Sequence, residues 1–159
     1  MREAILFIML MCCGVVYPQH VEHIKEKHFE GYIFSKECSL CGLPPGDNRF
    51  TPSVEDVKKA EQMIHENADT IVGESRRFFK KKDAIKKRKL KKYIRQYWGE
   101  ISSNGDHILC VTFRCRGINM SAIERCEISV PFDGGTCFFE LNIDMKRNKI
   151  IKIEINGVA

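Results

Sequence analysis

The pattern that most constrains this fold is an alternation of apolar and polar residues through the last fifty residues, 109–159. Short runs rich in β-branched and aromatic side chains carry it, at 108–113, 126–130, 137–144 and 150–155. Asp-Gly-Gly and Lys-Arg-Asn-Lys sequences separate the later runs, and Asn-Gly lies just before the first. Runs of this length joined by tight-turn sequences predict antiparallel strands.

A further strand is expected at 92–101, paired through the turn 102–106 with the strand 107–115. The turn holds Asn104-Gly105, the strongest short-range hairpin signal. Alternation places Tyr93, Arg95 and Tyr97 on one face of the strand. Gly99 interrupts the run, and an isolated strand glycine predicts a bulge.

One helix is expected ahead of the sheet, from Ser53 to about Val72, ended by Gly73. Its start is signalled either by Thr51-Pro52 or by Ser53 with Asp56 in a capping box. An apolar stripe follows at helical spacing, formed by Val57, Ala60, Ile64, Ala68 and Ile71. The predicted fold is therefore α+β, one amphipathic helix on a four-stranded antiparallel sheet with strands near 92–101, 107–115, 126–131 and 136–155, the last with a hairpin at 146–149.

The N-terminal segment 1–19 has the composition of a signal peptide, with one base followed by an uncharged apolar run. The run is too short to cross a bilayer, and cleavage is expected between about 14 and 19. We therefore expect a secreted or periplasmic protein. A lipid anchor on Cys12 or Cys13 is less favoured, because Leu10-Met11 are not small. Residues 20–49 are expected to form an irregular segment containing Cys and His, and 50–159 the α+β domain.

Export would place the cysteines in an oxidising compartment. Removal of the signal peptide leaves six, an even number that favours disulfides in an oxidising compartment but allows fifteen pairings. The preferred pairing is Cys38 with Cys41, with the other four pairing among themselves. The alternative is a zinc site, in which Cys38-Ser39-Leu40-Cys41 would act with His20, His23 and His28. No second Cys-x-x-Cys is present, so neither a metal nor another cofactor is predicted. The disulfide candidates are Cys38, Cys41, Cys110, Cys115, Cys126 and Cys137.

The strongest charge feature is a basic block at 76–95. It holds twelve bases and one acid, a net +11 that leaves −6 on the rest of a chain whose total is +5. The block is expected to be a frayed second helix or a long ordered loop. It is either a polyanion site or a solvated linker, and acids such as Glu127, Glu140 and Glu154 would neutralise it in a purely structural role. The candidate polyanion-binding residues are Arg76, Arg77, Lys80, Lys81, Lys82, Lys86, Lys87, Arg88, Lys89, Lys91 and Lys92.

Four stretches between residues 50 and 159 resemble a family of small exported bacterial proteins of unknown function. They are Phe50-Thr51-Pro52-Ser53, Tyr93-Ile94-Arg95-Gln96-Tyr97-Trp98-Gly99, Asp133-Gly134-Gly135-Thr136-Cys137-Phe138-Phe139 and Ile155-Asn156-Gly157-Val158-Ala159. The resemblance implies a layout similar to that of cystatins, with one helix across a curved antiparallel sheet. It implies no catalytic residues.

The sequence holds few motifs that would indicate catalysis. His107 is the only histidine in the strand region, so a Cys-His nucleophile pair would have to use it with Cys110, Cys126 or Cys137. The sequence shows no nucleotide-binding Gly-rich loop, serine elbow or carboxylate cluster, and no enzyme is predicted. We expect an exported, non-catalytic binding protein whose partner is an unknown protein or an envelope polyanion. Genomic nucleic acid is not expected, and membrane contact is expected only through a lipid anchor, if one is present.

The alternative function is a cystatin-like inhibitor of secreted proteases. Cystatins insert a hairpin tip and an N-terminal segment into a cleft, but the tip here, 102–106, has a different sequence from theirs. A papain inhibition assay distinguishes the two functions.

Overall fold

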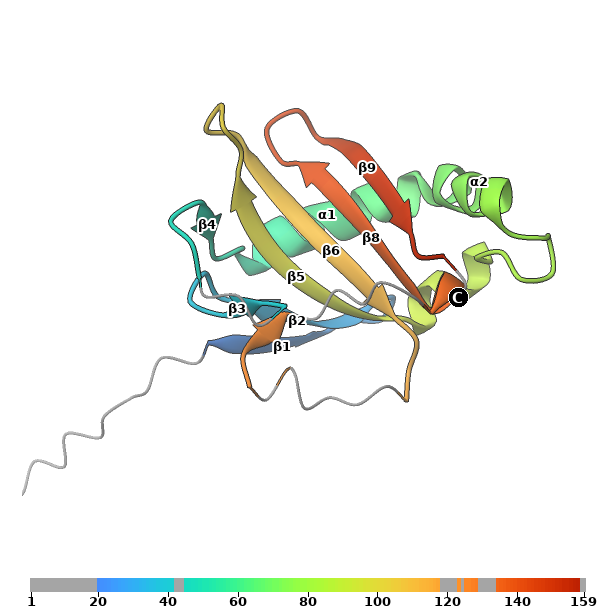
Figure 1. The fold of residues 1–159 in the computed structure, drawn as a ribbon, viewed down its shortest axis with the longest axis horizontal. Coiled ribbons are helices and arrows are strands. Elements are labelled where there is room, and N and C mark those ends of the chain that lie inside the picture. The colour runs from blue at the N-terminus through green and yellow to red at the C-terminus, as the bar shows by residue number, and fades with distance from the viewer. Residues whose placement is uncertain (1–19, 42–44, 118–122, 124, 129–133, 158–159) are drawn as a thin grey trace, which may run out of the picture.

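The computed structural model describes residues 20–41, 45–117, 123, 125–128 and 134–157. The expected signal peptide at 1–19 and the end of the expected strand at 126–131 lie outside these ranges. Figure 1 shows a twisted sheet with one helix crossing a face of it, a second helix continuing past the red strand at the sheet's edge, and a smaller pair of strands on the opposite side. The fold class is α+β, as predicted.

The main sheet has seven strands, more than the four expected. Its order is β1-β2-β5-β6-β8-β9, and β4 also pairs with β5. Neighbours are antiparallel except β2 and β5, which are parallel, so the all-antiparallel prediction is wrong. The strands are β1 Val21–Lys25, β2 Glu30–Phe34, β4 Arg49–Phe50, β5 Ile94–Ile101, β6 His107–Arg114, β8 Phe138–Asp144 and β9 Lys149–Ile155.

Both predicted hairpins are confirmed. β5 pairs with β6 up to Ile101 opposite His107, and Gly105 at the turn has φ +77°. β8 pairs with β9 up to Asp144 opposite Lys149, and Asn148 has φ +52°. Glycine and asparagine adopt this left-handed conformation more readily than other residues, which is why these turn sequences identified the hairpins.

The predicted bulge at Gly99 is wrong. Its pairing with Leu109 continues the β5–β6 register without a shift. A Cβ at this position would lie 2.6 Å from the ring and the carbonyl oxygen of Phe50. Glycine therefore lets β4 approach β5 closely. The shift in pairing register lies instead on β8, between Asn142 and Ile143.

Two helices replace the single one expected. α1 spans Val54–Glu66 and α2 spans Ala68–Phe78, with Asn67 between them. The capping box at Ser53 is confirmed, since its Oγ accepts from the Asp56 N–H at 3.1 Å and Asp56 accepts from the Ser53 N–H at 2.9 Å. Gly73 does not end a helix but lies inside α2.

The main core fills the space between the helices and the sheet. Buried aliphatic residues of α1 and α2 face a central aromatic group on the strands. Phe113 and Phe139 stack with ring centroids 4.1 Å apart, and the Tyr93 ring meets Phe139 edge-on at 5.2 Å. The helical stripe predicted from the sequence is buried here, with members Val57, Ala60, Ile64, Ala68 and Ile71.

The other face of the sheet carries a second, smaller core. Trp98, Cys110 and Ile108 pack there with Phe34 and Ile128. It is associated with a separate parallel pair, β3 Ser39–Leu40 and β7 Glu127–Ile128. The segment expected as a strand of the main sheet at 126–131 therefore belongs, in its described part, to this small pair.

The expectation of an irregular segment at 20–49 is wrong for β1 and β2. These strands form a hairpin, and β2 extends the sheet by pairing with β5. Gly31 permits this contact, because a Cβ there would lie 2.6 Å from the carbonyl oxygen of Arg95. The hairpin thus belongs to the same sheet as the strands after residue 93.

Two disulfides are formed, Cys38–Cys126 and Cys115–Cys137. The expected pairing of Cys38 with Cys41 is therefore wrong. Cys41 lies next to the end of β3, where its N–H donates to the Ile128 carbonyl at 2.8 Å, and it belongs to neither disulfide. Cys110 is a buried thiol on β6.

Candidate anion-binding site

The base of the site is a buried ion pair between a strand and a helix. Arg95 of β5 is 2% exposed, and its Nε lies 2.7 Å from Glu61 Oε1 of α1. The Nε–H is not aligned with that oxygen for a hydrogen bond, so the contact is one of charge. The Tyr97 hydroxyl donates to the same oxygen at 2.8 Å, and Arg95 Nη1 donates to the Tyr93 carbonyl at 2.9 Å.

The surroundings of this pair are apolar. The Arg95 guanidinium lies over the Phe113 ring, 4.9 Å from its centroid. Burial raises the pKa of Glu61 above its usual value, while Arg95 and the Tyr97 hydroxyl act in the opposite direction. Burial, together with Glu61, also raises the pKa of Tyr97 well above the usual value. Burying these two charges therefore costs free energy of desolvation. Their mutual attraction offsets this cost only while both partners are present.

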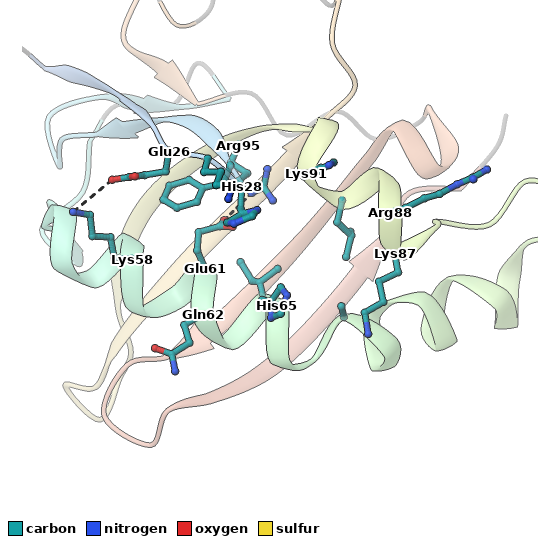
Figure 2. A pocket seen from close by; sticks show the side chains of 15 residues that line it. Glu26, His28, Lys58, Glu61, Gln62, His65, Lys87, Arg88, Lys91 and Arg95 are labelled. Carbon is teal, nitrogen blue, oxygen red and sulfur yellow. Dashed lines mark ion pairs between the residues drawn. The ribbon is translucent and has the colours of Figure 1, made fainter.

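Above the pair the surface opens into a cavity of about 1030 Å³ with three walls. The turn between β1 and β2 forms one wall, α1 the second and the 3₁₀ helix η1, Lys87–Lys92, the third. Figure 2 shows Glu26 and His28 on the turn, Lys58, Gln62 and His65 on α1, and Lys87, Arg88 and Lys91 on η1.

Positive charge dominates the lining. It includes six Lys or Arg and two Glu, a formal +4 with the histidines neutral: Lys27, Lys58, Lys87, Arg88, Lys91 and Arg95 against Glu26 and Glu61. Both acids already face bases, since Glu26 lies 3.6 Å from Lys58 and Glu61 pairs with Arg95. Lys87 also pairs outside the lining, with Asp69 at 2.8 Å. The remaining rim bases can attract an anion.

Apolar side chains lie between these charges. Phe29 comes from the turn, Ile64 and Ala68 from the helices and Leu90 from η1, and all four also belong to the main core. Their outer atoms give the cavity an uncharged wall beside the basic rim. Such a surface suits a ligand with an anionic group attached to an apolar body.

The predicted basic block is divided between several places. Arg76 and Arg77 lie in the last turn of α2, Lys80–Lys82 lie in the turn after it, Lys86 precedes η1, the next bases form η1, and Arg95 lies on β5. Lys87, Arg88 and Lys91 line the cavity, while Arg76, Lys81 and Lys86 line a second hollow of about 510 Å³ beside it. The block is thus one short helix end, a turn and a 3₁₀ helix, and not one long helix.

Most of the block's charge is not neutralised by ion pairs. Arg77 pairs with Glu74, Lys87 with Asp69 and Arg95 with Glu61. Within the part of the chain that the structure describes, the other nine of its twelve bases have no ion pair: Arg76, Lys80, Lys81, Lys82, Lys86, Arg88, Lys89, Lys91 and Lys92. Charges of one sign held together attract anions and raise their local concentration.

The acids proposed from the sequence as internal counter-charges have other surroundings. Glu127 pairs with Arg125 at 3.0 Å, and Glu154 pairs with Lys152 of its own strand. Glu140 is partly buried on β8, where burial raises its pKa to about 7. Over the residues that the structure describes, none of these three acids forms an ion pair with the block, so the alternative in which they neutralise it is not supported.

The other sequence candidates are not brought together. Alternation along β6 places His107 on the helix-facing side, stacked on Phe50 at 4.3 Å, whereas Cys110 lies in the core of the opposite face. His23 stacks on Tyr32 and faces Glu30. Across the described ranges, no group of three or more His, Cys, Asp or Glu is placed to hold a metal ion.

None of the helices in the described ranges is both long and apolar enough to cross a membrane. In comparisons with known proteins, no family model, no curated protein and no solved structure matches this chain.

Most of the cavity comes from residues that were not candidates for the polyanion site, since only Lys87, Arg88 and Lys91 among its fifteen lining residues were. The main omissions are Lys58, Glu61 and His65 on α1 and Arg95 on β5, while His28 was considered only as a ligand of the alternative zinc site. One signal was present, because alternation already placed Arg95 on the same face as two tyrosines. A base at a core-facing position needs a buried acid nearby, and that requirement points to a site.

Proposed function

We propose that this chain is a non-catalytic binding protein for anionic ligands, and that the cavity between α1, η1 and the β1–β2 turn is its site. The observation that carries the proposal is the net positive lining beside an apolar wall. The basic block supplies three of the rim bases, which connects this site to the polyanion binding expected from the sequence.

Binding is proposed over catalysis because of the chemistry of the rim. Lysine and arginine side chains keep their protons near neutral pH, so they hold anions by charge and hydrogen bonds. We also propose that the protein acts outside the cytoplasm. Two disulfides are compatible with that location.

A fluorescent sulfonate with an aromatic body, 1-anilinonaphthalene-8-sulfonate, tests the cavity directly. The combined variant Arg88→Gln/Lys91→Gln removes two rim bases without touching the buried pair. We expect its dissociation constant for the probe to rise roughly two- to fivefold for each charge removed. Binding by the natural protein should weaken as salt is raised, because exposed charges are screened.

A matched control removes two exposed lysines that do not line the cavity, in the variant Lys36→Gln/Lys149→Gln. It has the same net charge as the rim variant, so a general charge effect would weaken both equally. Equal loss in the two variants, or a probe affinity that does not change with salt, would contradict the cavity as the site.

Larger polyanions require a separate test of the block. Replacing Lys80, Lys81, Lys82, Lys86, Lys87 and Lys89 with Gln should sharply lower the salt concentration needed to elute the protein from heparin. The fold should be unchanged, because five of these side chains are exposed and Lys86 is only partly buried. Unchanged retention of this variant would show that the block has a structural role only.

A further inference from the structure

A large apolar side chain projects into solvent at the end of α2. Phe78, the last residue of that helix, is 72% exposed. Among the described residues, Ile151 on β9 is the other large hydrophobic residue that is exposed, at 51%. A phenylalanine this exposed leaves most of its apolar surface free to be buried against another surface.

The backbone that carries Phe78 is fixed from both sides. The Phe79 N–H donates to the Ser75 carbonyl at 3.1 Å, and the buried Ser75 hydroxyl accepts from the Ile85 N–H at 2.7 Å. After the turn, Ala84 and Ile85 are buried, and the Ala84 N–H donates to the Lys80 carbonyl at 3.0 Å. The structure thus presents Phe78 on an anchored projection.

Bases surround this projection. Arg76, Lys80, Lys81 and Lys82 are exposed, and none of them has an ion pair with another residue in the described ranges. Arg77 is also exposed and pairs only with Glu74 of its own helix. Asp83 is the one acid of the block. An exposed aromatic ring is therefore followed closely by three bases with uncompensated charge, Lys80–Lys82, whereas Arg76 lies two helical positions before Phe78 and lines the second hollow.

We propose that this projection, formed by Phe78 with Lys80–Lys82, docks the protein on the surface of an anionic lipid bilayer. The lysines would contact lipid phosphates and carboxylates, and the Phe78 ring would enter the boundary between the headgroups and the acyl chains. Each basic residue near such a surface contributes about 1 kcal/mol, and an apolar ring adds the free energy of leaving water.

Charge and size favour a bilayer over other anionic partners. A soluble polyanion such as heparin offers no apolar medium for the Phe78 ring, so the ring would contribute little to that contact. A stable protein interface buries on the order of 1,200 Å² or more, whereas this projection presents one large apolar side chain among charges. A lipid surface accepts a single ring at any point and supplies mobile negative charge around it.

The proposal goes beyond the anion-binding cavity and uses other residues. Phe78, Lys80 and Lys82 do not line the cavity, and Arg88 and Lys91 are not in the projection. Either proposal can therefore fail while the other stands. It also departs from the expectation that membrane contact would require a lipid anchor.

Vesicle flotation tests the docking. We expect the protein to float with phosphatidylcholine vesicles that contain about 30% phosphatidylserine and to remain unbound with phosphatidylcholine alone. Phe78→Ala should weaken the partition about tenfold. Lys80→Gln/Lys81→Gln/Lys82→Gln should weaken it by about fivefold for each charge. The matched control is Ile151→Ala, which removes the other exposed apolar side chain and should leave the partition unchanged.

A second measurement follows the ring itself. In Phe78→Trp, lipids brominated in their acyl chains should quench the introduced tryptophan when anionic vesicles are added. The natural Trp98 is 4% exposed in the core of the opposite face, so its emission should not change. The proposal is overturned if anionic vesicles do not bind the protein. It is also overturned if they bind it with full affinity after Phe78→Ala and without quenching, which would indicate attraction to any polyanion.

Discussion

The Arg95 guanidinium and the Glu61 carboxylate meet at 2.7 Å where α1 crosses β5, and both side chains are almost fully shielded from water. Each charge compensates the other in an environment where an isolated ion would be very unfavourable. The contact also joins the helical layer to the sheet at the base of the proposed binding cavity. Stability and ligand binding therefore share one pair of residues.

Removing one member of this pair should be strongly destabilising. Glu61→Ala leaves the Arg95 charge buried without its partner, and we expect the free energy of unfolding to fall by about 3–5 kcal/mol. Urea denaturation monitored by circular dichroism measures the change. The control Glu22→Gln alters an exposed acid on β1 and should change stability by less than about 0.5 kcal/mol. A similar small effect for Glu61→Ala would show that the pair contributes little.

Glu140 should make stability depend on pH. Burial raises its pKa from 4.5 to about 7, with Lys152 opposing the shift and Glu154 adding to it. The folded chain thus keeps a proton that the unfolded chain loses. The stability from the neutral carboxyl is fully present below about pH 4.5 and is lost as the pH rises through about 7.

Glu140→Gln stays neutral at every pH and tests this directly. It should raise the free energy of unfolding by roughly 1–3 kcal/mol near pH 8 and change it little below about pH 4.5. Urea titrations at the two pH values give the comparison. The same gain in the free energy of unfolding at both pH values would mean that packing, and not ionisation of Glu140, is responsible.

Two glycines should respond to alanine in opposite directions. At Gly99 the new Cβ would lie 2.6 Å from the Phe50 ring and carbonyl oxygen, so Gly99→Ala should cost about 1–3 kcal/mol of stability by forcing β4 away from β5. At Gly73, inside α2, nothing lies within 4 Å, and Gly73→Ala should add about 0.5–1 kcal/mol. Thermal unfolding of both variants measures the contrast. A stable Gly99→Ala protein would argue against the close approach of β4.

The two disulfides should differ in their contribution to stability. Cys38–Cys126 closes 88 residues and Cys115–Cys137 closes 22, and the longer closure restricts the unfolded chain more. Replacing both cysteines of the first pair with Ser should therefore cost about 1 kcal/mol more than the same change in the second. Urea denaturation of the two double variants provides the measurement, and the reverse order would show that other effects dominate.

The parts of the fold that the sequence predicted are those defined by neighbouring residues. Asn104-Gly105 and Asn148 mark tight turns, so β5–β6 and β8–β9 were recognisable as hairpins. Ser53 and Asp56 marked the start of α1, because a capping box is also formed by residues close together in the sequence. The end of α1 at Asn67 was missed, because the apolar stripe continues through Ala68 into α2 without a break.

The parts that were missed depend on contacts between distant segments. β2 pairs in parallel with β5, more than sixty residues later, and no turn sequence signals such a contact. The cavity likewise depends on contacts between segments that are distant in the sequence. Its lysines on η1 stand out in a charge count, but Glu61 becomes meaningful only once the crossing of α1 over β5 brings it to Arg95.

The pairing of Cys38 with Cys126 has a consequence for the order of events as the chain is made. Synthesis runs from the N-terminus, so Cys41 is available to Cys38 long before a partner 88 residues away. The nearby thiol is also the easier one to reach by chance, because closing a short loop costs less entropy. The native bond therefore has to wait until β7 lies beside β3. Tertiary assembly, not proximity along the chain, selects the partner.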